Sequence, residues 1–230
     1  MQSIQLGNID IEVVLKDIKN VHLSVYPPNG RVRIAAPLHL DMDTIRIYSI
    51  SKLAWIKRQQ AKLRKQKRET PRLFINRESH YFGGKRYMLK IVPTTGKHQI
   101  ILKARSIEMH VHADTSLENR QKLMDEFYRI HLKAISATLI KKWQSILKVE
   151  VKTCGIKRMT TKWGTCNEKA GRIWLNLELA KKPVEYLEYV VLHEMVHLKE
   201  RKHNERFVAY LDKHMPNWRH LKEELNRLGV

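Results

Sequence analysis

Residues 183–200 read Pro183-Val-Glu-Tyr-Leu-Glu-Tyr-Val-Val-Leu-His-Glu-Met-Val-His-Leu-Lys-Glu200. Pro183 is typical of a first helical turn, where its missing N–H needs no partner. Apolar residues then recur at spacings of three and four, the period of a helix with one face in a core. They are Val184, Leu187, Val191, Met195 and Leu198. The stretch therefore predicts a helix, and the apolar run before His193 predicts that this part of it is buried.

Two histidines of this helix are placed to share a ligand. His193 and His197 lie one turn apart on the same side, so their imidazoles can converge on one metal ion. Glu194 stands beside them, where it can act on a water molecule rather than bind the metal. This is the His-Glu-x-x-His pattern of zinc hydrolases. The alternative is a surface helix with two solvated histidines, but buried His and Glu side chains need partners, and a metal supplies one.

A third ligand is expected from the chain that follows the helix. A break just before His203 lets the chain turn back toward the metal, and Asn204 can cap a new helix there. Position alone favours His203 as the third ligand. The spacing leaves other candidates open, and these are Glu200, Glu205, His214 and His220.

Composition narrows the class of protein. A chain of 230 residues with 43% hydrophobic residues can bury a proper core, which excludes a disordered chain. No apolar run could span a bilayer, the first ten residues lack the pattern of a signal peptide, and only Cys154 and Cys166 are present. We therefore expect a cytoplasmic protein with no membrane partner and no disulfide framework.

The charge balance points to anionic partners. Lys and Arg outnumber Asp and Glu by 44 to 23, a formal net charge of +21. A field of this strength favours nucleic acid or nucleotides, although a simply solvated basic surface would give the same count. The densest basic run, residues 57–68, is the leading candidate for contact with phosphates.

The amino-terminal half is expected to be rich in strands. Residues 1–37 predict antiparallel strands with a turn at residues 27–30. One helix is expected from Asp41 or Asp43 to about Glu69. A second set of strands is predicted at residues 86–92, 98–103 and 107–112, and we interpret His110 and His112 as surface residues.

The carboxy-terminal half is expected to carry the chemistry. Ser116 can cap a long helix that ends near Leu147 and supports the helix with the two histidines. Short strands are predicted at residues 149–152 and 157–161. Residues 172–179 alternate in polarity and predict a further strand, which could pair with an extended substrate or could be purely structural. A helix after Asn204 and a last one over residues 217–228 complete the chain.

Together these elements predict an α+β fold with two parts. Residues 1–113 would form an amino-terminal antiparallel β-rich region with one basic helix. Residues 114–230 would form a zincin-like metallopeptidase domain with a long bracing helix. Four residues near the motif are candidates for substrate contact, and these are Arg158, Lys162, Trp163 and Asn176.

Several stretches carry a resemblance to a known family. They are residues 193–197 with His203-Asn204, Lys162-Trp-Gly-Thr-Cys166, and the upstream segments 30–37, 52–57 and 81–87. Across nearly its whole length the chain resembles the YgjP-like predicted metal-dependent hydrolases, relatives of the SprT-like and WLM zinc metallopeptidases. The resemblance implies a zincin-like domain with one Zn²⁺ on His193, His197 and His203 and Glu194 as the catalytic acid/base. The chain departs from the family pattern at Thr165 and Asn204, where Ser is common, and neither change removes a ligand.

Three neutral imidazoles leave the fourth position of zinc to water, which is the arrangement of a catalytic site. The favoured hypothesis is therefore a zinc-dependent hydrolase that cleaves peptide bonds in a peptide or protein substrate. One alternative is a metal-dependent nucleotide pyrophosphatase or phosphohydrolase, whose phosphoanhydride substrate would suit the basic surface. Another is a nucleic-acid-associated protein whose zinc site is not catalytic.

Overall fold

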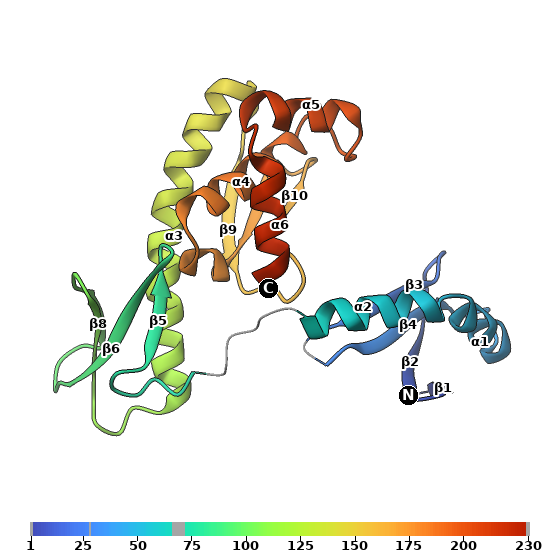
Figure 1. Ribbon diagram of the computed structural model, residues 1–230, viewed down its shortest axis with the longest axis horizontal. Coiled ribbons are helices and arrows are strands. Elements are labelled where there is room, and N and C mark those ends of the chain that lie inside the picture. The colour runs from blue at the N-terminus through green and yellow to red at the C-terminus, as the bar shows by residue number, and fades with distance from the viewer. Residues whose placement is uncertain (1, 28, 66–71, 229–230) are drawn as a thin grey trace. The chain divides into compact units, whose positions relative to one another are not determined.

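The computed structural model describes residues 2–27, 29–65 and 72–228. The chain divides into two compact units, and the division falls inside residues 66–71, which lie outside the described residues. The first unit holds the elements up to α2, and the second holds those from β5 to Leu225 in α6 (Figure 1). The fold is mixed α+β, as predicted. No described helix is both long enough and apolar enough to cross a membrane.

The first unit is built on a four-stranded sheet. Its spatial order is β1-β2-β4-β3, and the strands are β1 (Gln2–Leu6), β2 (Ile9–Lys16), β3 (His22–Tyr26) and β4 (Arg31–Pro37). The outer pairs are antiparallel, but β2 and β4 run parallel. The prediction of purely antiparallel strands is therefore wrong for the central pair. The reason is that β3 lies at the edge of the sheet, and β4, which is antiparallel to β3, lies between β3 and β2.

Two helices complete the first unit. They are α1 (Met42–Ser51) and α2 (Leu53–Lys65), with Asp41 capping α1 by accepting the Thr44 N–H at 2.7 Å. The single helix predicted here is interrupted at Lys52, which ends α1. The predicted end near Glu69 lies outside the described residues. The core of this unit contains Ile4, Ile9, Ile11, Val13, Val32, Ile34, Ala36, Ile45 and Ile56.

The second unit begins with a sheet packed on a long helix. The sheet has the order β5-β6-β8-β7, with β5 (Ser79–Phe82), β6 (Lys85–Pro93), β7 (Gln99–Leu102) and β8 (Ser106–Val111). The helix is α3 (Leu117–Leu147), and it is capped as predicted because the Ser116 hydroxyl accepts the Asn119 N–H. Ile130 and Ile135 are exposed, whereas Tyr128 and Trp143 are buried.

A three-stranded sheet and a 3-10 turn lead into the helix with the histidines. The sheet has the order β10-β11-β9, with β9 (Thr153–Lys157), β10 (Gly164–Asn167) and β11 (Arg172–Asn176). The chain then forms η1 (Leu177–Lys181), α4 (Val184–Val196), α5 (Glu205–His214) and α6 (Trp218–Leu228). The strands predicted at residues 149–152 and 157–161 are replaced by the single strand β9. The strand predicted over residues 172–179 stops at Asn176, because the Asn176 side chain caps η1 by accepting the Glu178 N–H at 3.2 Å.

The turn between β5 and β6 ties the first sheet of this unit to the start of α4. Gly83 and Gly84 donate their N–H groups to the carbonyls of Ala180 and Lys181 at 2.9 and 3.1 Å. Gly84 has a φ of +79°, and a Cβ there would lie 2.6 Å from Pro183 Cγ. The sheet β5–β8 therefore shares one core with α3 and α4. The structure divides the chain earlier than the predicted boundary between residues 113 and 114, which falls inside the second unit.

Candidate metal centre

The helix α4 holds two histidines at the edge of the core. The four residues before His193 are almost fully buried, and these are Tyr189, Val190, Val191 and Leu192. His193 lies in the last turn and His197 is the C-cap, so the helix ends at the second histidine. Their ring centroids lie 5.1 Å apart. The buried helix thus fixes both imidazoles on one side, as the spacing predicts.

The chain returns to the helix at His203. The Asn204 side chain caps α5 by accepting the Phe207 N–H at 3.0 Å, which fixes the backbone next to His203. Phe207 is 2% exposed, and its ring lies 4.6–4.9 Å from the rings of all three histidines. This aromatic ring supports the cluster from within the core.

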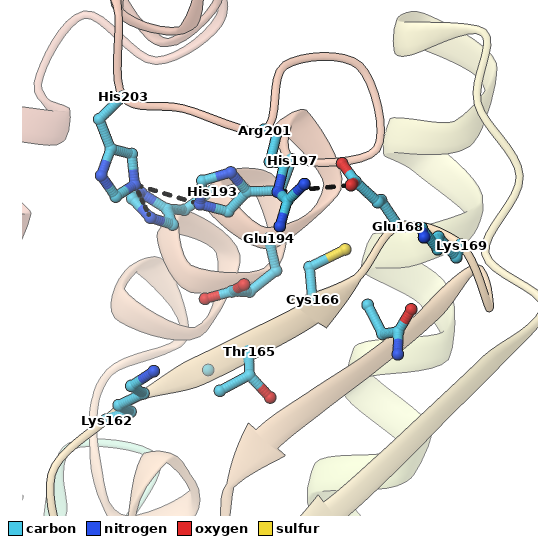
Figure 2. Close-up of a pocket in the computed structure, with 12 residues that line it drawn as sticks. Lys162, Thr165, Cys166, Glu168, Lys169, His193, Glu194, His197, Arg201 and His203 are labelled. Carbon is cyan, nitrogen blue, oxygen red and sulfur yellow. Dashed lines mark hydrogen bonds and ion pairs between the residues drawn. The ribbon is translucent and has the colours of Figure 1, made fainter. Parts of the chain in front are cut away.

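The three imidazoles converge through their Nε2 atoms (Figure 2). His203 Nε2 lies 3.1 Å from Nε2 of both His193 and His197. Two nitrogen ligands on a tetrahedral zinc, with bonds of about 2.0–2.1 Å, lie roughly 3.3 Å apart. A single ring N–H is shared poorly between two acceptors, whereas one cation could be bound by all three Nε2 atoms at once. The donor set and its spacing fit one Zn²⁺.

The protonation of the rings also suits a metal. His197 places Nδ1 3.1 Å from the Glu200 carbonyl, and an Nδ1–H donated there leaves the Nε2 lone pair free. Burial, together with the neighbouring His197 and His203 rings, lowers the pKa of His193 to about 3. The pKa of His203 is also lowered, by burial and then by His197. Neutral imidazole is the form that binds metal ions.

No other group of described His, Cys, Asp and Glu residues has separations that would suit a metal ion. His214, one of the candidates that the spacing left open, packs its ring edge against Trp143. The Glu200 carbonyl, rather than its carboxylate, contacts the cluster through His197. The geometry therefore brings His203, and not the other candidates, to the pair on α4.

Glu194 is the buried carboxyl group beside the cluster. It is 7% exposed and lines the same cavity as the three histidines. Burial raises the pKa of Glu194 to about 7, and the Lys162 ammonium opposes part of this rise. A carboxyl group with a pKa near neutrality can both accept and return a proton.

The cluster lies in a cavity of about 610 Å³. Its lining comes from β10 and the turn after it, from α4, and from the segment between α4 and α5. The lining residues are Lys162, Gly164, Thr165, Cys166, Asn167, Glu168, Lys169, His193, Glu194, His197, Arg201 and His203. Figure 2 shows β10 running along one side of the cavity, with the three histidines across from it.

The strand beside the cavity is β10, and it is an edge strand. Among the strands that the structure describes, it pairs with β11 alone, whereas β11 lies between β10 and β9. The strand predicted to pair with a substrate, residues 172–179, is therefore the central one, and its hydrogen bonds are already used. The free edge belongs to residues 164–167.

Only one of the four predicted substrate-contact residues reaches the cavity. Lys162 lines it, but Trp163 packs against the core of the second unit. Arg158 forms ion pairs with Asp125, at 2.8 Å, and with Glu178. Arg158 is not among the residues that line the cavity.

Asn176 is fully buried and organises the loop that carries Lys162. Its Nδ2 donates to the carbonyls of Met159 and Lys162 at 2.9 and 2.7 Å. Its backbone N–H donates to the Trp163 carbonyl at 2.9 Å. Asn176 thus fixes the backbone on which Lys162 stands and does not itself line the cavity.

Several cavity residues were missed by the sequence analysis. Gly164 gives Glu194 its space, because a Cβ there would lie 2.8 Å from the Glu194 Cγ and Oε1 atoms. Arg201 and Glu168 form a 3.5 Å ion pair at the cavity (Figure 2). Burial raises the pKa of Cys166 to about 11, with Glu194 adding to the rise. Gly164 and Cys166 do belong to the stretch 162–166 that carries the family resemblance, but their place beside the cavity depends on the sheet order, which the sequence does not show.

Comparison with known proteins gives one family and a few distant structures. A family model described as YgjP-like, metallopeptidase domain, matches residues 19–228. The metallopeptidase zymogen abylysin of Pyrococcus abyssi is 21% identical, with a TM-score of 0.37 over 41% of this chain and 99% of abylysin. The metallopeptidase zymogen jannalysin of Methanocaldococcus jannaschii is 22% identical, with a TM-score of 0.34 over 40% and 91%. No curated protein matches the sequence.

Proposed function

Because the chain belongs to the YgjP-like metallopeptidase family, we propose that it is a zinc-dependent peptidase with one Zn²⁺ on His193, His197 and His203. The observation that carries the proposal is the convergence of three Nε2 atoms next to a buried carboxyl group in one open cavity. A site with three imidazole ligands keeps a fourth position for water or substrate, which separates catalytic from structural zinc sites.

When bound, zinc would supply a Lewis acid that lowers the pKa of a water molecule and polarises the substrate carbonyl. The proton transfer is assigned to Glu194. Its carboxylate would take the proton of the attacking water and pass it to the nitrogen of the departing amine. The space next to Gly164 lets this carboxylate stand between α4 and β10.

The edge of β10 is the proposed docking line for the peptide. An extended chain can add to an open sheet edge through backbone hydrogen bonds, and residues 164–167 offer such an edge along the cavity. Lys162 stands two residues before this strand and lines the cavity. We assign it to stabilising negative charge that develops on the substrate oxygen.

A second candidate function uses the same donors. Lys162 and Lys169 line the cavity with the three histidines, and two ammonium groups next to a metal ion would also suit a phosphoanhydride. A nucleotide phosphohydrolase is therefore the alternative to a peptidase. The free strand edge favours the peptidase, because a nucleotide would not use it.

One variant separates the catalytic reading from a merely structural zinc site. Glu194→Gln keeps the size of the side chain and removes its ability to accept a proton. We expect the variant to bind one zinc per chain, measured by atomic emission, and to lose hydrolysis of casein by at least about 100-fold, the lower range for a general base. A matched control is Glu205→Gln, which changes an exposed carboxylate in the first turn of α5.

The same proteins should be incubated with nucleoside triphosphates. Hydrolysis of these and not of casein, lost in Glu194→Gln, would assign the site to phosphoanhydrides. Equal activity of wild type and Glu194→Gln on either substrate would contradict the role of Glu194. No hydrolysis by the zinc-loaded wild type would favour a site that is not catalytic.

A further inference from the structure

The outward face of α2 carries only positive charge. The helix exposes Lys57, Arg58, Lys62 and Arg64 and contains no Asp or Glu. Arg58 and Lys62 are four residues apart and Lys57 and Arg64 seven apart, so the four side chains form two rows on the exposed half of the helix. We call these four residues the α2 basic face. It belongs to the first unit and contains no residue of the candidate metal centre.

None of these four side chains has an acidic partner among the residues that the structure describes. Some exposed cations elsewhere do have such a partner. In α3, Lys122 pairs with Glu118 at 2.7 Å, and in the first unit Arg31 lies 3.9 Å from Glu12. Like charges one turn apart on a helix repel, so the α2 basic face is destabilising unless an anion offsets it.

The rest of α2 is fixed to the unit beneath it. Ile56 is fully buried in the core, and the Gln60 side chain donates to the Gly30 carbonyl at 2.9 Å. The four cations are therefore presented by an ordered element. A ligand would gain their charge without having to order the backbone that carries them.

We propose that the α2 basic face binds the phosphate backbone of duplex nucleic acid without reading its sequence. Lys57 and Arg64 are seven residues apart, which is about 10 Å along the helix axis and matches the rise of about three successive phosphates in one strand. The formal net charge of +21 would attract the same partner over a longer range.

Two features favour a duplex over other polyanions. The one aromatic residue of α2, Trp55, packs against the core of the unit, so the face offers no platform on which single-stranded bases could stack. The apolar side of α2 is likewise turned into the core. A basic helix that binds membranes needs its apolar side free to enter the lipid.

The test measures binding of the full-length protein to a short fluorescent DNA duplex by anisotropy, between about 50 and 200 mM salt. Three to four phosphate contacts predict a slope of log K against log salt of about −3. Arg58→Gln/Lys62→Gln should lower the steepness by about 1.8 and weaken binding at least about tenfold. Lys133→Gln/Lys141→Gln removes the same charge from exposed positions on α3 and should leave binding near the wild-type value.

Circular dichroism of both double variants should match the wild type, so that a loss of binding reports the face and not the fold. Two further ligands complete the test, and these are the matching single strand and phosphatidylserine vesicles. Vesicles are included because Ile47 and Ile50 of α1 are exposed. The proposal is overturned by no duplex binding at low salt, by equal weakening in both double variants, or by tighter binding to either further ligand.

Discussion

The position of the Glu194 side chain depends on the glycine at position 164, which has no side chain. The carboxyl group is buried in a cavity wall where β10 passes close to α4, and Gly164 leaves the space that the carboxyl group occupies. Burial raises the Glu194 pKa to about 7, so its position and its proton affinity have one cause. Any side chain at position 164 would disturb both.

We therefore expect Gly164→Ala to impair catalysis without removing the metal. The new Cβ would lie 2.8 Å from Glu194 Cγ and Oε1 and 2.9 Å from Val190 Cγ1, so the carboxyl group must move. A displaced general base should lower kcat by about tenfold or more, with zinc content near one per chain. Steady-state kinetics and metal analysis check this.

The matched control is Gly96→Ala. A Cβ at Gly96 meets nothing closer than Thr94 Oγ1 at 3.5 Å, so this variant should keep wild-type kinetics. Unchanged kcat in Gly164→Ala would show that Glu194 needs no fixed position.

The pKa of Cys154 gives a test of burial in the second unit. Burial raises its pKa to about 11. Only the thiolate reacts with iodoacetamide, so a raised pKa means that less of it is present at neutral pH, by on the order of 100-fold relative to an ordinary cysteine. In a Cys166→Ser background, where Cys154 is the only cysteine, alkylation should be slow at pH 7.5 and rise steadily toward pH 10.

Mass spectrometry of the alkylated protein follows this rate. The urea-unfolded protein is the control, and it should react at the rate of a free thiol. Rapid, complete labelling of the folded protein at pH 7.5 would mean that β9 is open to solvent.

Helical spacing predicts that His193 and His197 lie on one side of a helix, as the structure has them. Spacing alone left His203 among several candidates for the third ligand, and the family resemblance favoured it. The surroundings of these histidines could not be predicted in this way. The space at Gly164 depends on β10 passing over α4, two segments that are distant in the sequence. No pattern within either segment predicts that the two come this close.

At the scale of elements, the end of β11 holds the loop that brings Lys162 to the cavity lining. Asn176 is the last residue of that strand, it is fully buried, and its side chain bonds to backbone groups of Met159, Lys162 and Glu178. One side chain thus holds the loop before β10 and the start of η1 together.

We expect Asn176→Ala to destabilise the second unit by about 3 kcal/mol, because several buried polar groups lose their partners at once. Urea unfolding followed by tryptophan fluorescence measures this. Asn167→Ala is the matched control, since Asn167 is exposed and its side chain accepts a single bond from the Ala170 N–H. A loss no larger than that of the control would show that the loop is held by other contacts.

Local patterns predicted the types of the elements better than their ends. The alternation of residues 172–179 suits a strand throughout, yet Asn176 caps a 3-10 turn because its side chain is bonded to a loop. Local patterns also cannot predict that β2 and β4 pair in parallel. That pairing depends on the order of the strands in the sheet, in which β4 lies between β2 and β3.

At the scale of the whole molecule, the strands of residues 1–113 belong to two units rather than one. The sheet β5–β8 contributes Leu89, Ile107, Met109 and Val111 to the same core as α3 and α4. Charge composition and strand propensity could not show this, because both sets of strands look alike in the sequence. The close approach of Gly84 to Pro183 and the Gly83 and Gly84 hydrogen bonds to Ala180 and Lys181 join the sheet to the start of α4.

This organisation predicts where the chain can be cut. A fragment of residues 72–230 retains the core that surrounds the metal centre, so it should fold and bind one zinc. A fragment of residues 114–230 loses the sheet side of that core and exposes Phe127 and Met124, so it should aggregate or lack fixed packing. Near-ultraviolet circular dichroism and limited proteolysis distinguish the two. A well-folded 114–230 fragment would contradict the shared core.

The most direct measurement of the central claim is zinc K-edge X-ray absorption of the protein loaded with one equivalent of zinc. Three imidazoles and one oxygen predict a first shell of nitrogen and oxygen at about 2.0–2.1 Å, with outer-shell scattering from three rings. Substituting His203 with Ala should remove one ring from that signal. A sulfur shell at about 2.3 Å, or a signal unaffected by loss of His203, would contradict the three-histidine site.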